Sequence, residues 1–492
     1  MPLELPEELL ALIVDFVTEN KDKATLSRLA LVDRALLTHV RQHRSAEIII
    51  AQSLSTHRYV RRLRDIIVAD PSFAACITSI HLVEQSTWRI DSGSFEWLTR
   101  SDADGLADIL QSLVSLRRLS VTNDKLGAFI DWDLIDVAVQ RALLDLFCLP
   151  SLETLVLNRI INMELTPLID RSNLKELALL SVSLSDRNLE RIKAGGPAAS
   201  VGERASKGRL ESLEIADCGT TLQKLLTGFA QDDAQLEASY LRSLQVHSTQ
   251  YDSAAEAAIQ ELLLKCAVHL ERLSFHVHIN SGRPEGELRA LDFLRFHQFP
   301  LVQTLDVEFL VMLSCQPIPQ PYTDAIVTAL RNLSHESLRV LRLTFTLQIL
   351  CQPAFLARDA RNSSKAILDV DLWEQMDSMA GECFAGMESL EIVVLGERWW
   401  CNSPDLANLV NNIYSRMPTL SSKQVLHVNW YAEIPIILVD FVEINTDRID
   451  EAETLTGNSP HTSLPMYTFL GFQCLGRCIN NFTKLYRMML SN

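Results

Sequence analysis

The sequence lacks the short motifs on which most enzyme active sites are built. It contains no Gly-x-Ser-x-Gly nucleophile turn, no Gly-x-x-x-x-Gly-Lys-Ser/Thr phosphate loop, no Gly-x-Gly-x-x-Gly dinucleotide turn and no His-Glu-x-x-His zinc helix. Its ten cysteines form no Cys-x-x-Cys pair, and no flanking histidine lies at zinc spacing. We therefore expect a protein that is not an enzyme, with no catalytic residue, bound metal or cofactor.

One pair of histidines is the best candidate for a metal site. In "HVH", His276 and His278 lie two residues apart and so point to the same side of a strand. No carboxylate or third histidine lies in the same repeat. A polar sheet face is therefore favoured over a metal site.

Positive charge is in short supply. Lysine and arginine number 45 against 62 aspartate and glutamate residues, which gives a formal net charge of −17. Nucleic-acid binding needs a basic face that neutralises phosphates, so this balance argues against a nucleic-acid partner. The local exception is a basic cluster that is best explained as the solvated face of a helix, with nuclear import or phosphate binding as the alternative: Arg58, Arg61, Arg62 and Arg64.

No hydrophobic run is long enough to cross a bilayer. The most apolar late stretch, 433–442, is short and contains Pro435 and Asp440. Where a secretory signal needs positive charge, the first residues include Glu4, Glu7 and Glu8. We expect no membrane partner and an intracellular protein that is cytoplasmic, nuclear or both.

Residues 1–45 predict three short helices. The first spans Leu5–Val17, the second lies near Thr25–Leu31, and the third opens at Asp33, a good N-cap. The first helix is apolar around more than half its circumference, whereas a single core-facing stripe needs less. Because so short a segment buries little area, we expect this helix to be covered on two sides, by its own domain and by a partner.

From residue 46 onward the sequence repeats the pattern Leu-x-x-Leu-x-apolar. In each copy the fourth and sixth residues are apolar and the fifth varies, which is the period of a short strand with one buried face. Helix-like stretches such as 136–147 and 254–270 lie between copies. Ten clear copies occur, and successive copies begin between 22 and 49 residues apart. A more degenerate copy covers 423–428. The ten clear copies start at Ile77, Leu116, Leu152, Leu174, Leu210, Leu241, Leu270, Val302, Leu338 and Met387.

A strand followed by a helix, repeated at this period, is typical of leucine-rich repeats. The predicted fold class is therefore α/β: after the N-terminal helices, an irregular leucine-rich-repeat solenoid over 46–492, with parallel strands on the concave face and helices on the convex face. The alternative is a doubly wound sheet, whose strands usually read as continuous apolar runs. The irregular spacing calls for insertions, and we expect flexible ones near 193–209 and 454–465.

The opening segment resembles the F-box motif, in the form common among large fungal F-box families. "LPEELLALIVDFV" followed by "ATLSRLALVDRALL" carries the resemblance, with Arg34 at the basic position. Many F-boxes have a tryptophan two residues later, where this chain has Leu36, which supplies less apolar area. The resemblance implies an F-box domain over 1–45 whose contacts to a Skp-family adaptor are Leu5, Pro6, Leu9, Leu10, Ile13, Val17, Leu26, Leu29, Val32 and Leu36.

The resemblance also implies a role and partners. F-box proteins with repeat domains are substrate-recognition subunits of SCF-type (Skp–cullin–F-box) ubiquitin ligases. We would then expect a cullin bound through the adaptor, and a target protein of unknown identity bound by the repeat domain. The alternative is a non-catalytic leucine-rich-repeat scaffold whose F-box is vestigial or serves complexes other than a ligase.

The exposed face of the repeat strands is the expected target-binding surface. The third and fifth residues of each copy, and the residue after the sixth, point away from the core. This row is polar and mixed, as a recognition surface is and as a solvated sheet face equally is. We expect Leu155, Leu213, Leu273 and Leu341 in the core. By reach or charge, the candidate target contacts are Arg118, His247, Arg272 and Asp306.

Overall fold

The fold is described by a computed structural model that covers most of the chain between residues 7 and 432. It describes residues 7–19, 46–51, 56–84, 105–123, 129–164, 173–185, 208–217, 219–230, 236–247, 253–280, 299–313, 337–349, 371–379, 386–396 and 404–432, with isolated positions at 25, 28, 29, 32, 36, 40, 98, 324, 327, 328, 330 and 331. The chain divides into two compact units. Unit 1 comprises Met1–Gln245 and Asp252–His269, and unit 2 comprises Val246–Tyr251 and Leu270–Asn492. The units do not divide at residue 45, where the F-box-like segment is expected to end.

The N-terminal segment contains one helix that is described over its whole length, α1 (Glu7–Glu19). Its Leu10 and Val14 are buried against Leu36 and Val40 in a small apolar cluster. Isolated helical positions occur between residues 25 and 40, but the second and third expected helices lie largely outside the described residues. The structure therefore shows that α1 packs against helical residues near Leu36 and Val40. It does not show the complete set of three predicted helices.

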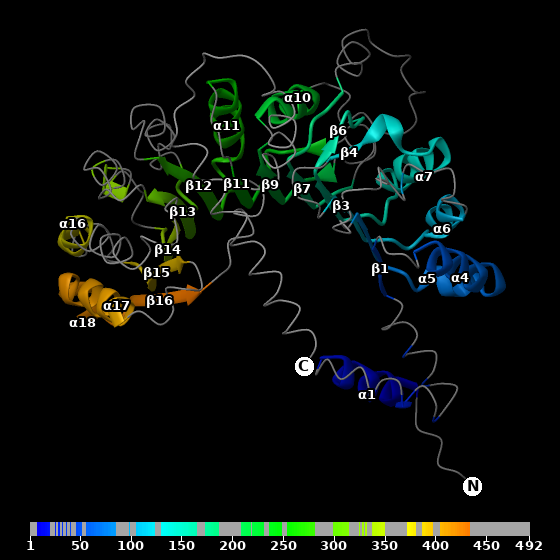
Figure 1. The fold of residues 1–492 in the computed structure, drawn as a ribbon, viewed down its shortest axis with the longest axis horizontal. Helices are drawn as coiled ribbons and strands as arrows, with labels where there is room; N and C mark the ends of the chain where they lie inside the picture. Colours follow the sequence, from blue (N-terminus) through cyan, green and yellow to red (C-terminus); the bar gives the residue numbers. More distant parts are fainter. Residues whose placement is uncertain are drawn as a thin grey trace, which may run out of the picture. The chain divides into compact units, whose positions relative to one another are not determined.

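Twelve parallel strands follow one another in chain order, and Figure 1 shows them with helices between. Strand β11 (Ser243–His247) contains the boundary between the units. Doubly wound sheets reverse their strand order at a switch point, and neither unit does so. The structure is thus α/β with a large parallel sheet. Unit 1 contains β1 (Glu47–Ala51), β2 (Ser79–Glu84), β3 (Arg118–Asn123), β5 (Thr154–Asn158), β7 (Glu176–Leu180) and β9 (Ser212–Ala216), and unit 2 contains β12 (Arg272–Asn280), β13 (Thr304–Leu313), β14 (Val340–Ile349), β15 (Ser389–Gly396) and β16 (Leu426–Ala432).

Every predicted copy of the repeat forms a strand, and each of the ten clear copies starts its strand at the third residue. In most copies the carbonyl of the second residue accepts two N–H groups from the next copy. The Arg117 oxygen accepts from the backbone nitrogens of Glu153 (2.8 Å) and Thr154 (2.9 Å). In unit 2 the Gln303 oxygen accepts from Arg339 (2.8 Å) and Val340 (2.9 Å) in the same way. This shared carbonyl sets the register between neighbouring copies.

The chain leaves three successive strands of unit 1 through the same turn. Arg159, Ser181 and Asp217 directly follow β5, β7 and β9, and all three adopt left-handed backbone angles, with φ of 55°, 52° and 50°. A non-glycine residue in this region costs free energy unless its surroundings hold it. Here the N–H groups of Arg159 and Ser181 donate to carbonyls of the following copy, Leu180 and Ala216, both at 2.7 Å.

The helices cover one face of the strands in each unit (Figure 1). The expected helix over 136–147 is confirmed as α7, whose N-cap Asp136 accepts hydrogen bonds from Ala138 and Val139. Among the described helices, none is both long and apolar enough to cross a membrane. Unit 1 contains α4 (Thr56–Ala69), α5 (Pro71–Ala75), α6 (Leu106–Ser112), the short 3-10 helix η1 (Trp132–Leu134), α7 (Val137–Phe147), α10 (Gly219–Phe229) and α11 (Ser253–Cys266), and unit 2 contains α16 (Leu372–Met379), α17 (Pro404–Arg416) and α18 (Pro418–Ser422).

Two small parallel sheets lie beside the main strands in unit 1, and one corrects an expected loop. β4 (Ile130–Asp131) pairs with β6 (Ile160–Ile161), and β8 (Gly208–Arg209) pairs with β10 (Leu236–Glu237). The insertion expected over 193–209 is therefore two residues too long, because backbone pairing with β10 orders Gly208 and Arg209. The rest of that insertion, and the one at 454–465, lie outside the described residues.

The core consists of ladders of leucines contributed by successive copies. Leu155 pairs with Leu177, which pairs with Leu213, and in unit 2 Leu273 pairs with Leu305 and then Leu341. The four leucines expected in the core are at most 1% exposed, which confirms that prediction. The buried side of the sheet is therefore the side that the repeat motif predicts.

Adjacent residues on β12 test this register. Leu273→Ala should cost about 2–5 kcal/mol of unfolding free energy because it leaves a cavity in a buried ladder. Arg272→Ala removes an exposed side chain and should cost no more than about 0.5 kcal/mol. Urea unfolding of the two variants measures both quantities, and equal losses would mean that the strand faces are assigned wrongly.

Candidate binding surfaces

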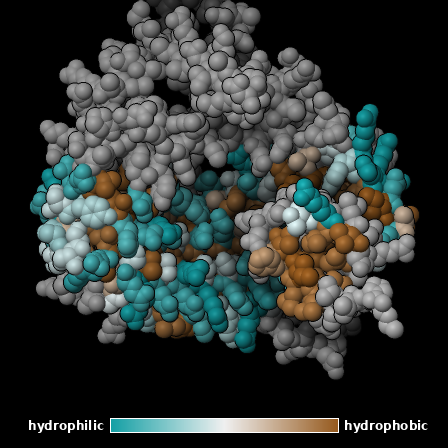
Figure 2. All heavy atoms as spheres, turned by 90° about the horizontal axis from the view of Figure 1, so that it is seen from below, coloured by the Kyte–Doolittle hydropathy of each residue, from teal (hydrophilic) through white to brown (hydrophobic). Residues whose placement is uncertain are grey.

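The first candidate is an apolar surface on α1. Four of its side chains lie at positions i, i+3, i+4 and i+7 and so share one helix face. Their exposed fractions are large, and they form the α1 apolar surface: Leu9 (45%), Leu12 (61%), Ile13 (40%) and Phe16 (67%). Figure 2 shows a contiguous apolar patch at the position of this helix. Exposed patches of this kind mark contact sites for other proteins.

The expected adaptor contacts fall on both sides of α1. Leu9 and Ile13 lie on the α1 apolar surface, whereas Leu10 is buried in the cluster with Leu36, and Val17 and Leu29 pack against it. Val32 is exposed. Three further expected contacts lie outside the described residues: Leu5, Pro6 and Leu26.

The adaptor contacts expected from the sequence did not include two members of the α1 apolar surface. Leu12 and Phe16 are its most exposed side chains. Their spacing of four residues from one another, and of three from Leu9 and Ile13, was the available signal. The same spacing rule places Leu10, Val14 and Val17 together on the inner face, which explains why one helix has two apolar sides.

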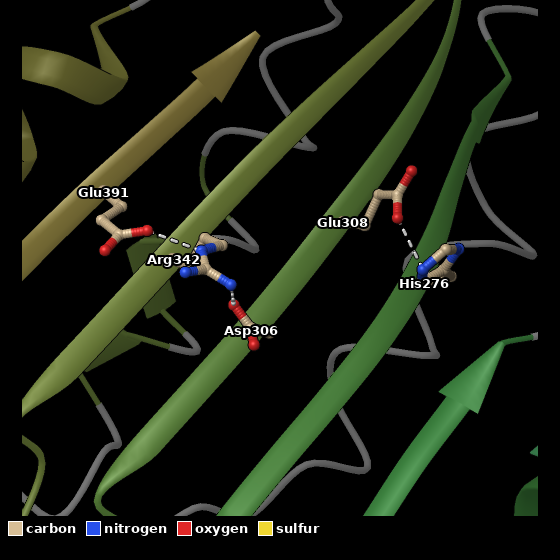
Figure 3. Close-up of polar contacts among 5 residues, drawn as sticks. All are labelled: His276, Asp306, Glu308, Arg342 and Glu391. Carbon is tan, nitrogen blue, oxygen red and sulfur yellow. Dashed lines mark hydrogen bonds and ion pairs between the residues drawn. The ribbon is translucent and has the colours of Figure 1, made fainter. Parts of the chain in front are cut away.

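The second candidate is a polar network on the exposed strand face of unit 2. It comprises His276, Asp306, Glu308, Arg342 and Glu391, and Figure 3 shows Arg342 between the two carboxylates of Asp306 and Glu391. Arg342 Nε donates to Glu391 Oε2 at 2.7 Å, and Arg342 Nη1 lies 3.6 Å from Asp306 Oδ1. His276 Nε2 lies 2.6 Å from Glu308 Oε2. We call these five residues the unit 2 polar network.

Strand register explains why these side chains meet. Asp306, Arg342 and Glu391 are the fifth residues of their copies and pair directly across β13, β14 and β15. His276 and Glu308 pair in the same way two residues further along β12 and β13. Sequence reasoning missed Arg342 and Glu391 as network members, although aligning the copies by their fifth positions would have placed them beside Asp306.

The two acids of β13 have opposite electrostatic environments. Burial raises the pKa of Asp306, and the nearby Arg342 offsets that effect only in part. Burial also acts to raise the pKa of Glu308, but hydrogen bonds from His276 and Thr346 outweigh it and hold the pKa below its usual value. Thr346 donates to Glu308 Oε1 at 2.7 Å. Glu308 is therefore stabilised as an anion, whereas Asp306 is not.

The structure places the four candidate target contacts in different surroundings. Arg272 is exposed at the start of β12, Asp306 belongs to the unit 2 polar network, and the ring of His247 lies edge-on to His276 with centroids 3.8 Å apart. Arg118 is exposed on β3 of unit 1. Whether any of them contacts a target stays a prediction.

One residue of the predicted exposed row lies inside instead. Ser120 on β3 is only 5% exposed, although its position predicts an outward side chain. Its partners in register are His81 and Val156. A small side chain between two larger neighbours is covered by them, which accounts for the difference.

Within the described residues, no group of three histidine, cysteine, aspartate or glutamate side chains is arranged to hold a metal ion. The side chain of His278, half of the predicted histidine pair, lies outside the described part.

Comparison with known proteins does not identify the chain. A scan against protein-family models gives no match. A search of curated proteins likewise finds no match.

The opposite pKa shifts on β13 predict opposite pH effects. Glu308→Gln should cost about 1–3 kcal/mol near neutral pH, because a charged acceptor loses its hydrogen bonds. A depressed folded-state pKa means that this stabilisation is present above the ordinary value of about 4.3 and is lost as the pH falls through the folded-state value. Urea unfolding of the wild type and the variant across this range measures the difference.

Asp306→Asn is the matched control on the same strand. Its folded-state pKa is raised, so the cost of the charge is present above that value and vanishes as the pH falls below about 3.9. The variant should be as stable as the wild type or more stable at neutral pH, with the gain disappearing on acidification. A Glu308→Gln loss that grows at low pH would contradict the assignment.

Proposed function

We propose that this chain is an F-box-type substrate receptor of an SCF-type ubiquitin ligase. The α1 apolar surface binds a Skp-family adaptor and, through it, a cullin. The exposed strand face of the repeats binds a target protein. The chain itself carries out no bond chemistry and acts by holding the target near the transferred ubiquitin.

The observation that carries this proposal is the second apolar face of α1. The inner face already packs against Leu36 and Val40, so the outer face is not needed to close the small cluster. Leaving Leu12 and Phe16 mostly in water is unfavourable, since burying such a side chain fully is worth about 1.5–3 kcal/mol. A partner that covers this face recovers that free energy. The adaptor is the partner that the F-box resemblance of this segment implies.

The parallel repeat strands support the target-binding half of the proposal. Strand faces of repeat proteins present long rows of side chains on a rigid frame. In unit 2 this row carries partly exposed charged groups, including Arg342 at 46% and Asp306 at 33% of their side-chain areas. We assign target recognition to this face, with Arg272, His247 and Asp306 as first contacts and Arg118 on the face of unit 1.

The alternative is a non-catalytic repeat scaffold whose F-box-like segment serves other complexes. In this alternative the strand face binds a target in the same way, and only the protein that covers the outer face of α1 differs. In either case we expect an intracellular protein, cytoplasmic or nuclear, without a membrane or nucleic-acid partner.

The adaptor-binding half is tested with a double variant, Leu9→Ala and Ile13→Ala. It removes two of the four side chains of the α1 apolar surface without touching the buried Leu10 and Val14. We expect co-purification with a recombinant Skp-family adaptor to fall at least about tenfold, since each truncation removes several apolar groups that are worth about 0.8 kcal/mol apiece when buried, and about 1.4 kcal/mol in total is a tenfold change.

The matched control is Leu134→Ala with Val137→Ala, two exposed apolar residues of unit 1 outside α1. This pair should leave adaptor binding unchanged. Undiminished binding by the Leu9 and Ile13 variant, with the wild type binding, would contradict the proposed interface. A wild type that does not bind the adaptor would favour the scaffold alternative.

A further inference from the structure

A second exposed surface lies on helix α4 and has no place in the proposed function. The buried residues of α4 form a narrow stripe, Thr56, Val60, Leu63 and Ile67. On the opposite side lie three exposed arginines, Arg58, Arg61 and Arg62, which we call the α4 arginine face. They occur together in a chain with a net charge of −17. Such a concentration of one charge against the overall balance calls for an explanation.

The three guanidinium groups have no polar partner among the described residues. Across the part of the chain that the structure covers, no ion pair or side-chain hydrogen bond involves any of them. Asp65 lies on the same face, four residues after Arg61. Among the described residues, these two side chains form no ion pair with each other. The fourth arginine of the cluster behaves differently. Arg64 lies 3.9 Å from Asp108 of α6, and its stem packs over Gly105.

The position of these arginines does not favour the helix. The first turn of α4 contains no acidic residue and includes Arg58, and its last turn contains no basic residue. The helix dipole prefers the reverse arrangement, with anions at the start and cations at the end. An acidic residue that follows a basic one by four positions is also the weaker orientation for a helical pair. The α4 arginine face therefore does not stabilise the fold.

Apolar side chains flank these arginines. Tyr59 and Ile66 lie next to Arg62 on the helix surface and are 45% and 39% exposed. Tyrosine and arginine are the residue types that contribute most to protein interfaces. Guanidinium groups bind carboxylates through paired, charge-assisted hydrogen bonds.

We propose that the α4 arginine face, with Tyr59 and Ile66, binds an acidic segment of a partner polypeptide that also carries apolar side chains. Three arginines form too small a cluster for a nucleic acid, whose binding rests on many phosphate contacts. An extended polyanion would also approach the acidic remainder of a chain whose net charge is −17. At physiological salt, charges more than about 8 Å away are largely screened. A short acidic segment meets only the local positive field. This surface is independent of the proposed adaptor and target contacts.

The test uses the full chain and a phage-displayed library of random peptides as probe. Selected peptides should contain more aspartate and glutamate than the unselected library, together with aromatic or aliphatic residues. Their binding, measured by fluorescence anisotropy, should weaken as salt is added. Failure to select any peptide, or selection without acidic enrichment, would overturn the proposal.

A triple variant then locates the site. Arg58→Gln, Arg61→Gln and Arg62→Gln keep helix propensity but remove the charge, so the melting temperature should be unchanged or higher. Binding of the selected peptides should fall by about tenfold or more. The control removes three exposed arginines elsewhere, Arg117→Gln, Arg141→Gln and Arg331→Gln, and should bind the peptides like the wild type.

Two outcomes would contradict the proposed role of the α4 arginine face. Tighter binding of the wild type to single-stranded RNA, or to phosphatidylserine vesicles, than to the peptides would overturn the proposal in favour of those ligands. Peptide binding that survives the triple variant would place the site elsewhere. Adaptor co-purification should be normal in the triple variant, so failure here is distinguishable from failure of the proposed function.

Discussion

In most of the repeats one backbone oxygen accepts two N–H groups from the next repeat, and the faces of the sheet depend on that contact. It occurs at Ala46, Arg117, Lys175 and Gln303, among others. It aligns neighbouring copies at the same motif position, and because side chains alternate along a strand, a slip of one residue would expose every buried leucine. Each such leucine is worth about 1.5–3 kcal/mol on full burial. Exposed ion pairs between neighbouring copies, such as Lys175 with Glu153 at 2.9 Å, are screened by water and contribute far less. Leucine burial therefore determines the register, and the polar groups follow it.

The same register determines what the protein can present to partners. The alignment that buries Leu305 and Leu341 places Asp306 beside Arg342 and then Glu391 on the opposite face. That face is partly exposed, with Arg342 at 46% and Asp306 at 33% of their side-chain areas. Helix α1 also has two different faces, which here follow from the 3.6-residue period of a helix. Leu10 and Val14 are buried in the apolar cluster with Leu36, whereas Leu9 and Phe16 lie on the exposed face. In both places the apolar side chains of one face are buried in the fold, whereas the side chains of the other face are wholly or partly exposed.

The strands were predictable from the sequence because each clear copy marks its start with a buried apolar residue. Strand β1 was not predicted, because Ser45 stands at the first position of its copy, where the motif has a leucine. Its apolar residues Ile48 and Ile50 nevertheless alternate with other residues as they do in the clear copies. The polar contacts of the unit 2 polar network were harder. Arg342 and Glu391 are 49 residues apart, and only the register of two strands brings them to 2.7 Å. Likewise the inner and outer sides of α1 could not be told apart from composition, because leucines and other apolar residues lie on both. Burial against Leu36 decides between them.

The central claim is that the outer face of α1 is a binding surface for a Skp-family adaptor. Hydrogen–deuterium exchange of the chain, alone and with saturating recombinant adaptor, measures this without any substitution. Backbone amides of an exposed helix exchange through local opening, which a bound partner suppresses. The account predicts slower exchange across 7–19 and unchanged exchange in β12–β15. Unchanged exchange across 7–19 in the presence of bound adaptor would contradict it.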